Sequence, residues 1–123
     1  MKIAMLGFGN IGAGFYEEIT SNYRDIEVVR ALVRDIKKPR AVDSSKLTSD
    51  FNAILNDPSI EAVVDVTAGD ASVKFIIEAL KASKSVITAN KMAVSLAGAE
   101  FIDIASEKGV NFYFEAAVGG GIP

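Results

Sequence analysis

The chain has 123 residues, of which 50% are hydrophobic and 24% are charged, enough to bury the core of one ordinary globular domain. Its net charge of −3 argues against a general nucleic-acid binder, which needs a basic face. The absence of cysteine and histidine excludes disulfides, thiolate nucleophiles, histidine acid–base chemistry and most zinc sites. Because no stretch is typical of a signal peptide or a membrane span, we expect a cytoplasmic protein without membrane contact.

The first half of the chain predicts two strands and two helices. Apolar residues 2–6, followed by a glycine, indicate a buried strand, and residues 10–22 carry apolar side chains at helical spacing. A second strand, rich in valine and leucine, is expected at 27–33. The polar stretch 35–48 is expected to be a loop, after which a run of N-cap residue types predicts a short helix through Leu55.

The second half continues the alternation of strands and helices. A third strand is expected at 61–66, where Asp65 is the one charged residue after the first position. A helix follows from Asp70 or Ser72, and its inward face carries Val73, Ile76, Ile77 and Leu80. A short fourth strand is expected at 85–88.

The last elements are a helix at 97–108, with Gly109 as its C-cap, and a fifth strand at 110–114. The residues of this helix expected to face inward are Phe101, Ile102 and Ala105. Since parallel neighbours need long crossover connections, strands that alternate with helices predict a parallel sheet. We therefore expect an α/β fold with a Rossmann-type, doubly wound, mostly parallel sheet, formed by residues 1–114 as a single domain.

A glycine motif joins the first strand to the first helix, and its sequence is Gly7-Phe8-Gly9-Asn10-Ile11-Gly12. In that context Gly7 permits a tight turn, Gly9 lets the backbone approach a pyrophosphate, and Gly12 permits close packing of helix and strand. The free N–H groups of the first helical turn would then face the phosphates. The alternative is a sharp turn in a fold without cofactor.

The end of the second strand bears on the choice between NAD and NADP. An acidic residue there usually accepts hydrogen bonds from the ribose 2′-hydroxyl, whereas an arginine favours a 2′-phosphate. The chain offers both, as Arg34 and Asp35, with a basic loop behind them. We expect NADP, bound through Arg34, with NAD use open through Asp35. The alternative is a solvated basic loop.

Polar residues also follow the later strands, where ligands bind in an open α/β sheet. Thr67 and Ala68 follow the third strand, and Thr88 ends the fourth, shortly before Lys91. Beside a cofactor, the Lys91 ammonium could bind a carbonyl oxygen and stabilise its developing charge. The alternatives are an ordinary strand-to-helix turn and a solvent-facing lysine. Small residues in 116–121 suit either a monovalent cation or an interdomain hinge.

Four segments together resemble the homoserine dehydrogenases, and the resemblance covers essentially the whole chain. They are Gly-Phe-Gly-Asn-Ile-Gly-Ala-Gly (7–14), Val-Val-Asp-Val-Thr (63–67), Ser-Val-Ile-Thr-Ala-Asn-Lys (85–91) and Phe-Glu-Ala-Ala-Val-Gly-Gly-Gly-Ile-Pro (114–123). The resemblance implies an NAD(P)-dependent oxidoreductase that interconverts aspartate semialdehyde and homoserine, in threonine and methionine biosynthesis, and acts as a homodimer when full length.

The resemblance also implies roles for individual residues. It places Phe8, Asn10, Ile11 and Thr67 at the cofactor, and Lys91 at cofactor and substrate as the catalytic residue. With the candidates already derived, the expected cofactor-binding set is Gly7, Phe8, Gly9, Asn10, Ile11, Gly12, Arg34, Thr67, Ala68, Thr88 and Lys91. The main-chain oxygens that match the family's sodium site belong to Glu115, Val118, Gly120 and Ile122.

The chain departs from the family pattern in two places. Residues 68–72 lack the second glycine and the proline that commonly follow the third strand, which puts the nicotinamide-side contacts in doubt. The family's second essential lysine and its acidic homoserine-binding residues lie in a later domain and are absent here. We therefore expect 115–123 to begin a connection to a missing catalytic and dimerisation domain, and the chain alone to bind cofactor without turnover.

Two other interpretations stay open. One is the nucleotide-binding half of another two-domain oxidoreductase, such as the glucose–fructose oxidoreductase type, which would typically show Glu-Lys-Pro where this chain has Asn90-Lys91-Met92. The other is a non-enzymatic redox-sensing module, for which an accompanying effector segment is expected and none is present.

Overall fold

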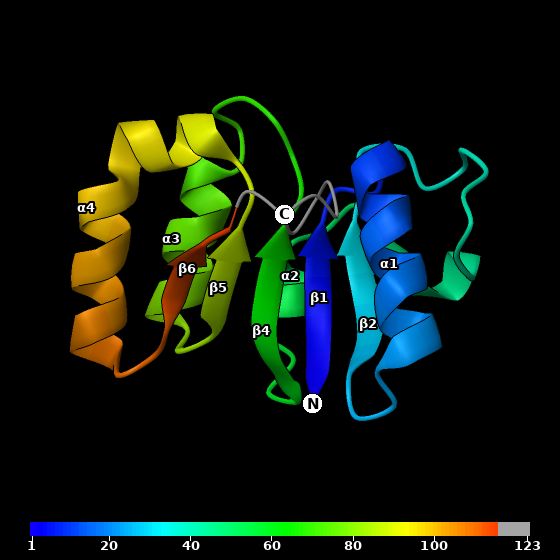
Figure 1. The fold of residues 1–123 in the computed structure, drawn as a ribbon, viewed down its shortest axis with the longest axis horizontal. Helices are drawn as coiled ribbons and strands as arrows, with labels where there is room; N and C mark the ends of the chain where they lie inside the picture. The colour runs from blue at the N-terminus through cyan, green and yellow to red at the C-terminus, as the bar shows by residue number, and fades with distance from the viewer. Residues whose placement is uncertain (116–123) are drawn as a thin grey trace.

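The computed structural model describes residues 1–115, which form a six-stranded parallel sheet between helices (Figure 1). The strand order is β3-β2-β1-β4-β5-β6. The strands are β1 (Lys2–Leu6), β2 (Glu27–Leu32), β3 (Leu47–Thr48), β4 (Ile60–Asp65), β5 (Ser85–Thr88) and β6 (Phe112–Phe114). The helices are α1 (Asn10–Asn22), the 3₁₀ turn η1 (Ser44–Lys46), α2 (Asn52–Leu55), α3 (Val73–Lys81) and α4 (Lys91–Lys108). Within residues 1–115 no helix is long and apolar enough to cross a membrane.

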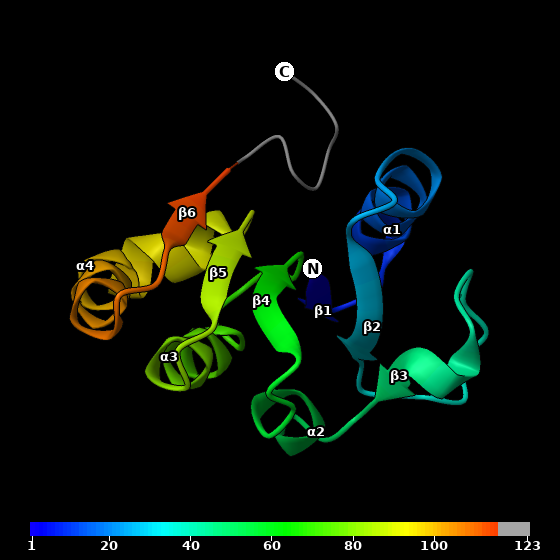
Figure 2. The ribbon, with the colours of Figure 1, turned by 90° about the horizontal axis from the view of Figure 1, so that it is seen from below.

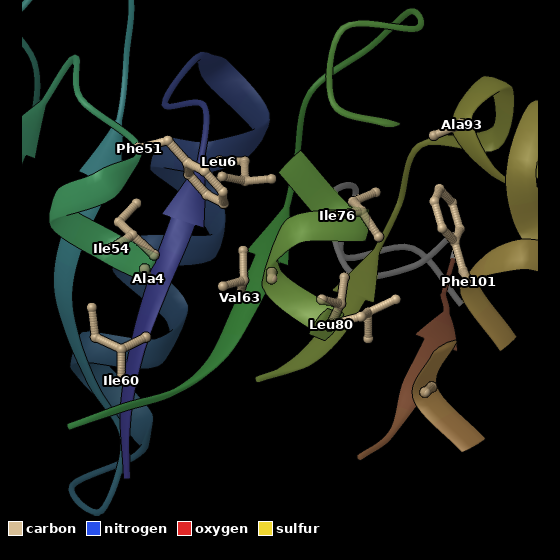
Figure 3. Packing of buried hydrophobic residues seen from close by; sticks show 13 residues of the cluster. Ala4, Leu6, Phe51, Ile54, Ile60, Val63, Ile76, Leu80, Ala93 and Phe101 are labelled. Carbon is tan, nitrogen blue, oxygen red and sulfur yellow. The ribbon is translucent and has the colours of Figure 1, made fainter. Parts of the chain in front are cut away.

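Each face of the sheet has its own hydrophobic core because successive strand residues point to opposite faces. On β1, Ile3 and Met5 belong to the cluster under α1, whereas Ala4 and Leu6 belong to the cluster under the other helices. Figure 2 shows α1 on one side of the sheet, with α2 and α3 on the other. Figure 3 shows the second cluster, which reaches Phe101 of α4. The predicted doubly wound α/β sheet is confirmed, and every strand pair is parallel.

Helix α4 differs from the prediction because it begins at Lys91 rather than at residue 97. The Asn90 side chain accepts a hydrogen bond from the Ala93 N–H at 3.1 Å, which caps an extra first turn. A non-helical residue, Ala97, with φ −143° and ψ 16°, separates this turn from the predicted part. Phe101 and Ala105 are buried as predicted, but the inward orientation predicted for Ile102 is wrong, since 60% of that residue is exposed.

The predicted loop at 35–48 is only partly a loop. Its last residues form η1 and then β3, which pairs with β2 at Ala31↔Leu47 and Leu32↔Thr48. The guanidinium of Arg30 on β2 donates to the Ser45 carbonyl at 2.9 Å and holds the turn beside the sheet. A strand of two residues is too short to show a pattern of alternating hydrophobicity, and for this reason it could not be predicted.

Gly12 brings α1 close to the sheet, and its replacement should be costly. A Cβ at this position would lie 3.2 Å from Val66 Cγ2 and 3.3 Å from both the Gly7 oxygen and Met5 Cε. We expect Gly12→Ala to lower the free energy of unfolding by about 1–3 kcal/mol through overpacking. Gly14→Ala in the same helix is the matched control, because nothing lies within 4 Å of its Cβ. It should stabilise the chain by roughly 0.5–1 kcal/mol. Equal effects of the two variants in urea unfolding would contradict this account.

Lys84 is a buried cation at the opposite edge of the sheet from the glycine turn. It is 4% exposed, and its Nζ donates to the main-chain oxygens of Asp57 at 2.8 Å and Ile60 at 2.9 Å. Desolvation lowers the pKa of Lys84 below its ordinary value of 10.5, and the charge of Asp57 opposes this shift. The ammonium thus fastens the loop before β4 to the turn before β5.

Removal of this ammonium should destabilise the fold. We expect Lys84→Met to lower the free energy of unfolding by about 1–3 kcal/mol, because two buried carbonyls lose their donor. Lys81→Met, at the exposed end of α3, is the control and should change stability little. Since the unfolded chain binds the Lys84 proton more tightly, wild-type stability should rise relative to Lys84→Met as the pH approaches 10.5 from below. A difference that falls with pH would contradict the assigned direction.

Candidate nucleotide-binding site

The turn between β1 and α1 leaves main-chain N–H groups open at the carboxyl edge of the sheet. Gly7 has φ +87°, and its own N–H donates to the Leu32 carbonyl at 2.8 Å. Helix α1 starts behind Gly9, which has no side chain to cap it, and the first turn holds no acidic residue. The N–H groups of the first turn and the helix dipole are therefore available to an anion.

The first two glycines of the motif meet different steric demands. A Cβ on Gly7 would lie 3.0 Å from Thr67 Cγ2, so this turn lies tightly against the turn that follows β4. Around Gly9 nothing lies within 4 Å of the position of a Cβ. The open space at Gly9 is where a bound group could approach the backbone, as a pyrophosphate does in this type of turn.

A cavity of about 1190 Å³ extends from this turn along the ends of β2 and β4. This volume exceeds the roughly 300–1,000 Å³ typical of drug-sized ligands, and it suits a dinucleotide. The predicted site residues that line the cavity are Gly7, Phe8, Gly9, Asn10, Arg34, Thr67 and Ala68. Among the lining residues, Phe8 is buried and packs edge-on against Tyr16, with ring centroids 5.5 Å apart.

One end of the cavity is basic. Arg34, Lys38 and Arg40 line it together. Arg40 is fixed by hydrogen bonds from its Nη1 to the Asp35 oxygen at 2.6 Å and the Lys38 oxygen at 3.0 Å. Within residues 1–115 no group accepts a hydrogen bond from the Arg34 guanidinium, which is exposed. The Asp35 carboxylate instead accepts from the Lys37 N–H at 2.9 Å and does not line the cavity.

Behind the other end of the cavity, which Thr67 and Ser72 line, lies a buried aspartate that sequence reasoning left without a role. Asp65 ends β4 and is 0% exposed. Its Oδ1 accepts from the Thr67 N–H at 2.9 Å and the Thr67 hydroxyl at 2.6 Å. Its Oδ2 accepts from the hydroxyls of Ser72 at 2.8 Å and Thr88 at 2.9 Å. The Asp65 side chain thus links the end of β4 to the start of α3 and to the end of β5.

The remaining predicted residues lie outside the cavity lining. Ile11 is half exposed on α1, and Lys91 is exposed as the first residue of α4. Gly12 packs beneath the turn, and the Thr88 hydroxyl is buried against Asp65. The Glu115 N–H donates to the Thr88 oxygen at 2.9 Å. The other expected sodium ligands, Val118, Gly120 and Ile122, lie outside the described residues, and residues 1–115 hold no cluster of acidic side chains suited to a metal.

Sequence reasoning missed Asp65, Ser72 and Asn90 as parts of this site. One signal was available, because a lone aspartate within an apolar strand must find hydrogen-bond partners when the strand is buried. Its partners could not be named in advance, since the turn after β5 approaches it only through the pairing of β4 with β5.

Comparison with known proteins agrees with this geometry. Residues 7–115 match the family model described as homoserine dehydrogenase, NAD binding domain. The chain is 33% identical to the homoserine dehydrogenase of Bacillus subtilis over 135 aligned residues, which cover all of this chain and 31% of that protein. The chain therefore spans about a third of the length of the curated relatives that it matches.

Solved structures give the same result. A crystal structure of Staphylococcus aureus homoserine dehydrogenase at pH 7.5 superposes with a TM-score of 0.86 and 38% identity, over 95% of this chain and 33% of that one. A hyperthermophilic archaeal homoserine dehydrogenase in complex with NADPH has a TM-score of 0.76 at 20% identity, over 94% of this chain and 44% of that one, and so shares the fold. From its motif, its sheet and these matches, the chain belongs to the NAD-binding domains of the homoserine dehydrogenases.

Proposed function

We propose that the chain is the nucleotide-binding part of an enzyme that interconverts L-aspartate 4-semialdehyde and L-homoserine with a nicotinamide cofactor. The observation that carries the proposal is the uncapped first turn of α1, which opens into a cavity of dinucleotide size. The reaction is a hydride transfer, and the nicotinamide ring supplies or accepts the hydride. The role of this chain is to bind the cofactor, to orient it, and to supply charge beside it at the edge of the sheet.

We further propose NADP as the preferred cofactor, with NAD bound more weakly. Arg34 lines the cavity with its guanidinium available, and Arg40 and Lys38 add positive charge beside it. A planar, permanently charged guanidinium suits a phosphate. A hydrogen bond from the ribose 2′-hydroxyl of NAD to Asp35 is less favoured, because the Asp35 carboxylate already accepts one from the Lys37 N–H. NADPH is also the nucleotide bound in the archaeal structure that shares this fold.

Lys91 is proposed as the catalytic residue. It is exposed at the start of α4, and the Asn90 cap fixes the main chain immediately before it. There its ammonium would donate to the carbonyl oxygen of the aldehyde and stabilise the charge that develops on it as hydride arrives. Transfer of one ammonium proton to that oxygen would complete the alcohol and leave a neutral amine, and in the reverse direction this amine would take the hydroxyl proton as the hydride leaves.

The family resemblance also supports a sodium ion held by main-chain oxygens of Glu115, Val118, Gly120 and Ile122. Within the described part, the Glu115 N–H bonds to the end of β5, which places the start of this segment at the carboxyl edge of the sheet. A cytoplasmic homodimer is proposed for the full-length enzyme on the same resemblance.

The NADP preference can be tested by calorimetric titration of the chain and an Arg34→Ala variant with NADPH and NADH. Loss of a hydrogen bond to a charged group should weaken NADPH binding by about 1.5–3 kcal/mol. NADH binding should barely change, because NADH carries no 2′-phosphate. Lys37→Ala is the control, since Lys37 lies in the same loop but does not line the cavity. An equal loss for both nucleotides would dismiss the assigned role of Arg34.

A second test asks whether this chain alone can bind the cofactor and turn over the substrate. We expect the 123-residue chain to bind NADPH but to show no measurable homoserine-dependent reduction of NADP⁺. The reason is that these 123 residues span about a third of the length of the matched relatives, and the family resemblance implies that homoserine is bound by residues of another domain. Absorbance at the NADPH band would follow the reaction over hours at high protein concentration. Steady turnover by the purified chain would show that the substrate site lies within these residues.

A further inference from the structure

Three hydroxyl groups lie between Asn90 and Asp65, and each has a defined direction. The hydroxyls of Thr67, Ser72 and Thr88 all donate to the Asp65 carboxylate. Asn90 lies within hydrogen-bond distance of the same three oxygens. Its main-chain N–H donates to Thr88 at 2.9 Å. Its side-chain NH2 has two hydrogens, which serve Ser72 at 3.1 Å and the Gly69 carbonyl at 2.9 Å, with a longer, shared contact to Thr67 at 3.3 Å. Asn90 therefore acts as the donor at one end of the network and Asp65 as the acceptor at the other.

Asp65 is the shared acceptor of this network. Its two oxygens receive four hydrogen bonds, and all four donors are neutral groups. An acidic side chain that is 0% exposed and held only by neutral donors within residues 1–115 is costly to bury, so this arrangement calls for a role beyond stability.

The network fixes Thr67, which lines the cavity, and Asn90, which lies behind the lining residues Thr67 and Ser72. It holds the Thr67 hydroxyl toward Asp65, which leaves the Thr67 methyl against the turn at Gly7. It also fixes the Asn90 amide, whose nitrogen donates to the Gly69 oxygen at 2.9 Å while its oxygen caps α4 through Ala93. The turn after β4 and the first turn of α4 are thus held in one arrangement, although they come from separate parts of the chain.

The network lies on one side only of the point where the strand order reverses. Asp65 ends β4 and Thr88 ends β5, whereas Arg34 follows β2 on the other side of β1. In a doubly wound sheet a dinucleotide lies across this point. With the adenosine half bound at Arg34, the nicotinamide half falls on the side of β4 and β5.

We propose that Asp65 and Asn90 are positioning residues that order the half of the site that receives the nicotinamide ring, and leave the adenosine half unaffected. The inference rests on the proposed function, since it assumes that the cavity takes NADP. Neither residue needs to touch the ring, because they act through Thr67 and the start of α4. A variant at either residue should therefore lose affinity for the whole cofactor but not for a ligand of the adenosine half. A general loss of folding would weaken the binding of both.

The test compares two ligands on the 123-residue chain and its Asp65→Asn variant. NADPH reports both halves of the site, whereas 2′,5′-ADP reports the adenosine half alone. Asparagine keeps the size of aspartate, but its NH2 cannot accept a hydrogen bond, so two of the four present hydrogen bonds to position 65 are lost whichever way the amide lies. We expect NADPH to bind about tenfold more weakly or worse, and the affinity for 2′,5′-ADP to change by less than about twofold.

Two further variants guard against a general loss of structure. Thr88→Val removes one donor to Asp65 with little change in shape, and should show the same pattern more weakly. Lys84→Met is the matched control, because it removes a buried polar group at the opposite edge of the sheet and should leave the ratio of the two affinities unchanged. Far-ultraviolet circular dichroism and urea unfolding establish that each variant is folded at the assay temperature.

Each outcome has a defined meaning. An equal loss of both ligands in Asp65→Asn, or no loss of either, would overturn the positioning role. If Asp65→Asn loses NADPH affinity but Thr88→Val keeps it, the claim that Asp65 acts through the hydroxyl network would be overturned. Failure of the wild-type chain to bind NADPH or 2′,5′-ADP would instead refute the proposed function, so the two failures are distinguishable.

Discussion

The site depends on the placement of β1 between β2 and β4. Its carboxyl end is bonded on both sides, since Gly7 donates to the Leu32 oxygen and Val66 donates to the Leu6 oxygen. These bonds bring the turn after β1 against the turn after β4, where a Cβ on Gly7 would lie 3.0 Å from the Thr67 methyl. Only a residue without a side chain, and free to take positive φ, fits at this point. The glycine motif is therefore required by the sheet as well as by a phosphate.

The same placement gives the site two ends of different electrostatic character. Basic side chains line the cavity beyond β2, and the buried carboxylate of Asp65 lies beneath the end of β4. The uncapped turn of α1 lies between them and supplies main-chain donors. A dinucleotide with negative charge at its phosphates and none on its reduced nicotinamide matches this arrangement. Under the proposed function, strand order would set the direction in which the dinucleotide lies across the site.

Sequence reasoning succeeded where the deciding interaction is local. The turn at Gly7 to Gly12, the amphipathic helix α1 and the C-cap at Gly109 all depend on neighbours within a few residues, and their prediction is confirmed. It failed where the deciding partner is distant. The start of α4 depends on Asn90, whose amide is oriented by groups about 20 residues earlier in the sequence. Tertiary contacts of this kind leave no periodic signal in the sequence.

The polar network at Asp65 has a cost that the fold could have avoided. An apolar residue at the end of β4, with apolar partners at the three hydroxyl positions, could pack at least as stably, because buried charges seldom stabilise a fold relative to hydrophobic replacements. Such apolar replacements would not fix the orientation of the neighbouring side chains. Hydrogen bonds fix the rotamers of Thr67 and Asn90, whereas apolar contacts tolerate several. The network therefore makes sense at a site where two turns must keep one geometry, and its position beside the cavity rather than in the central core agrees with that requirement.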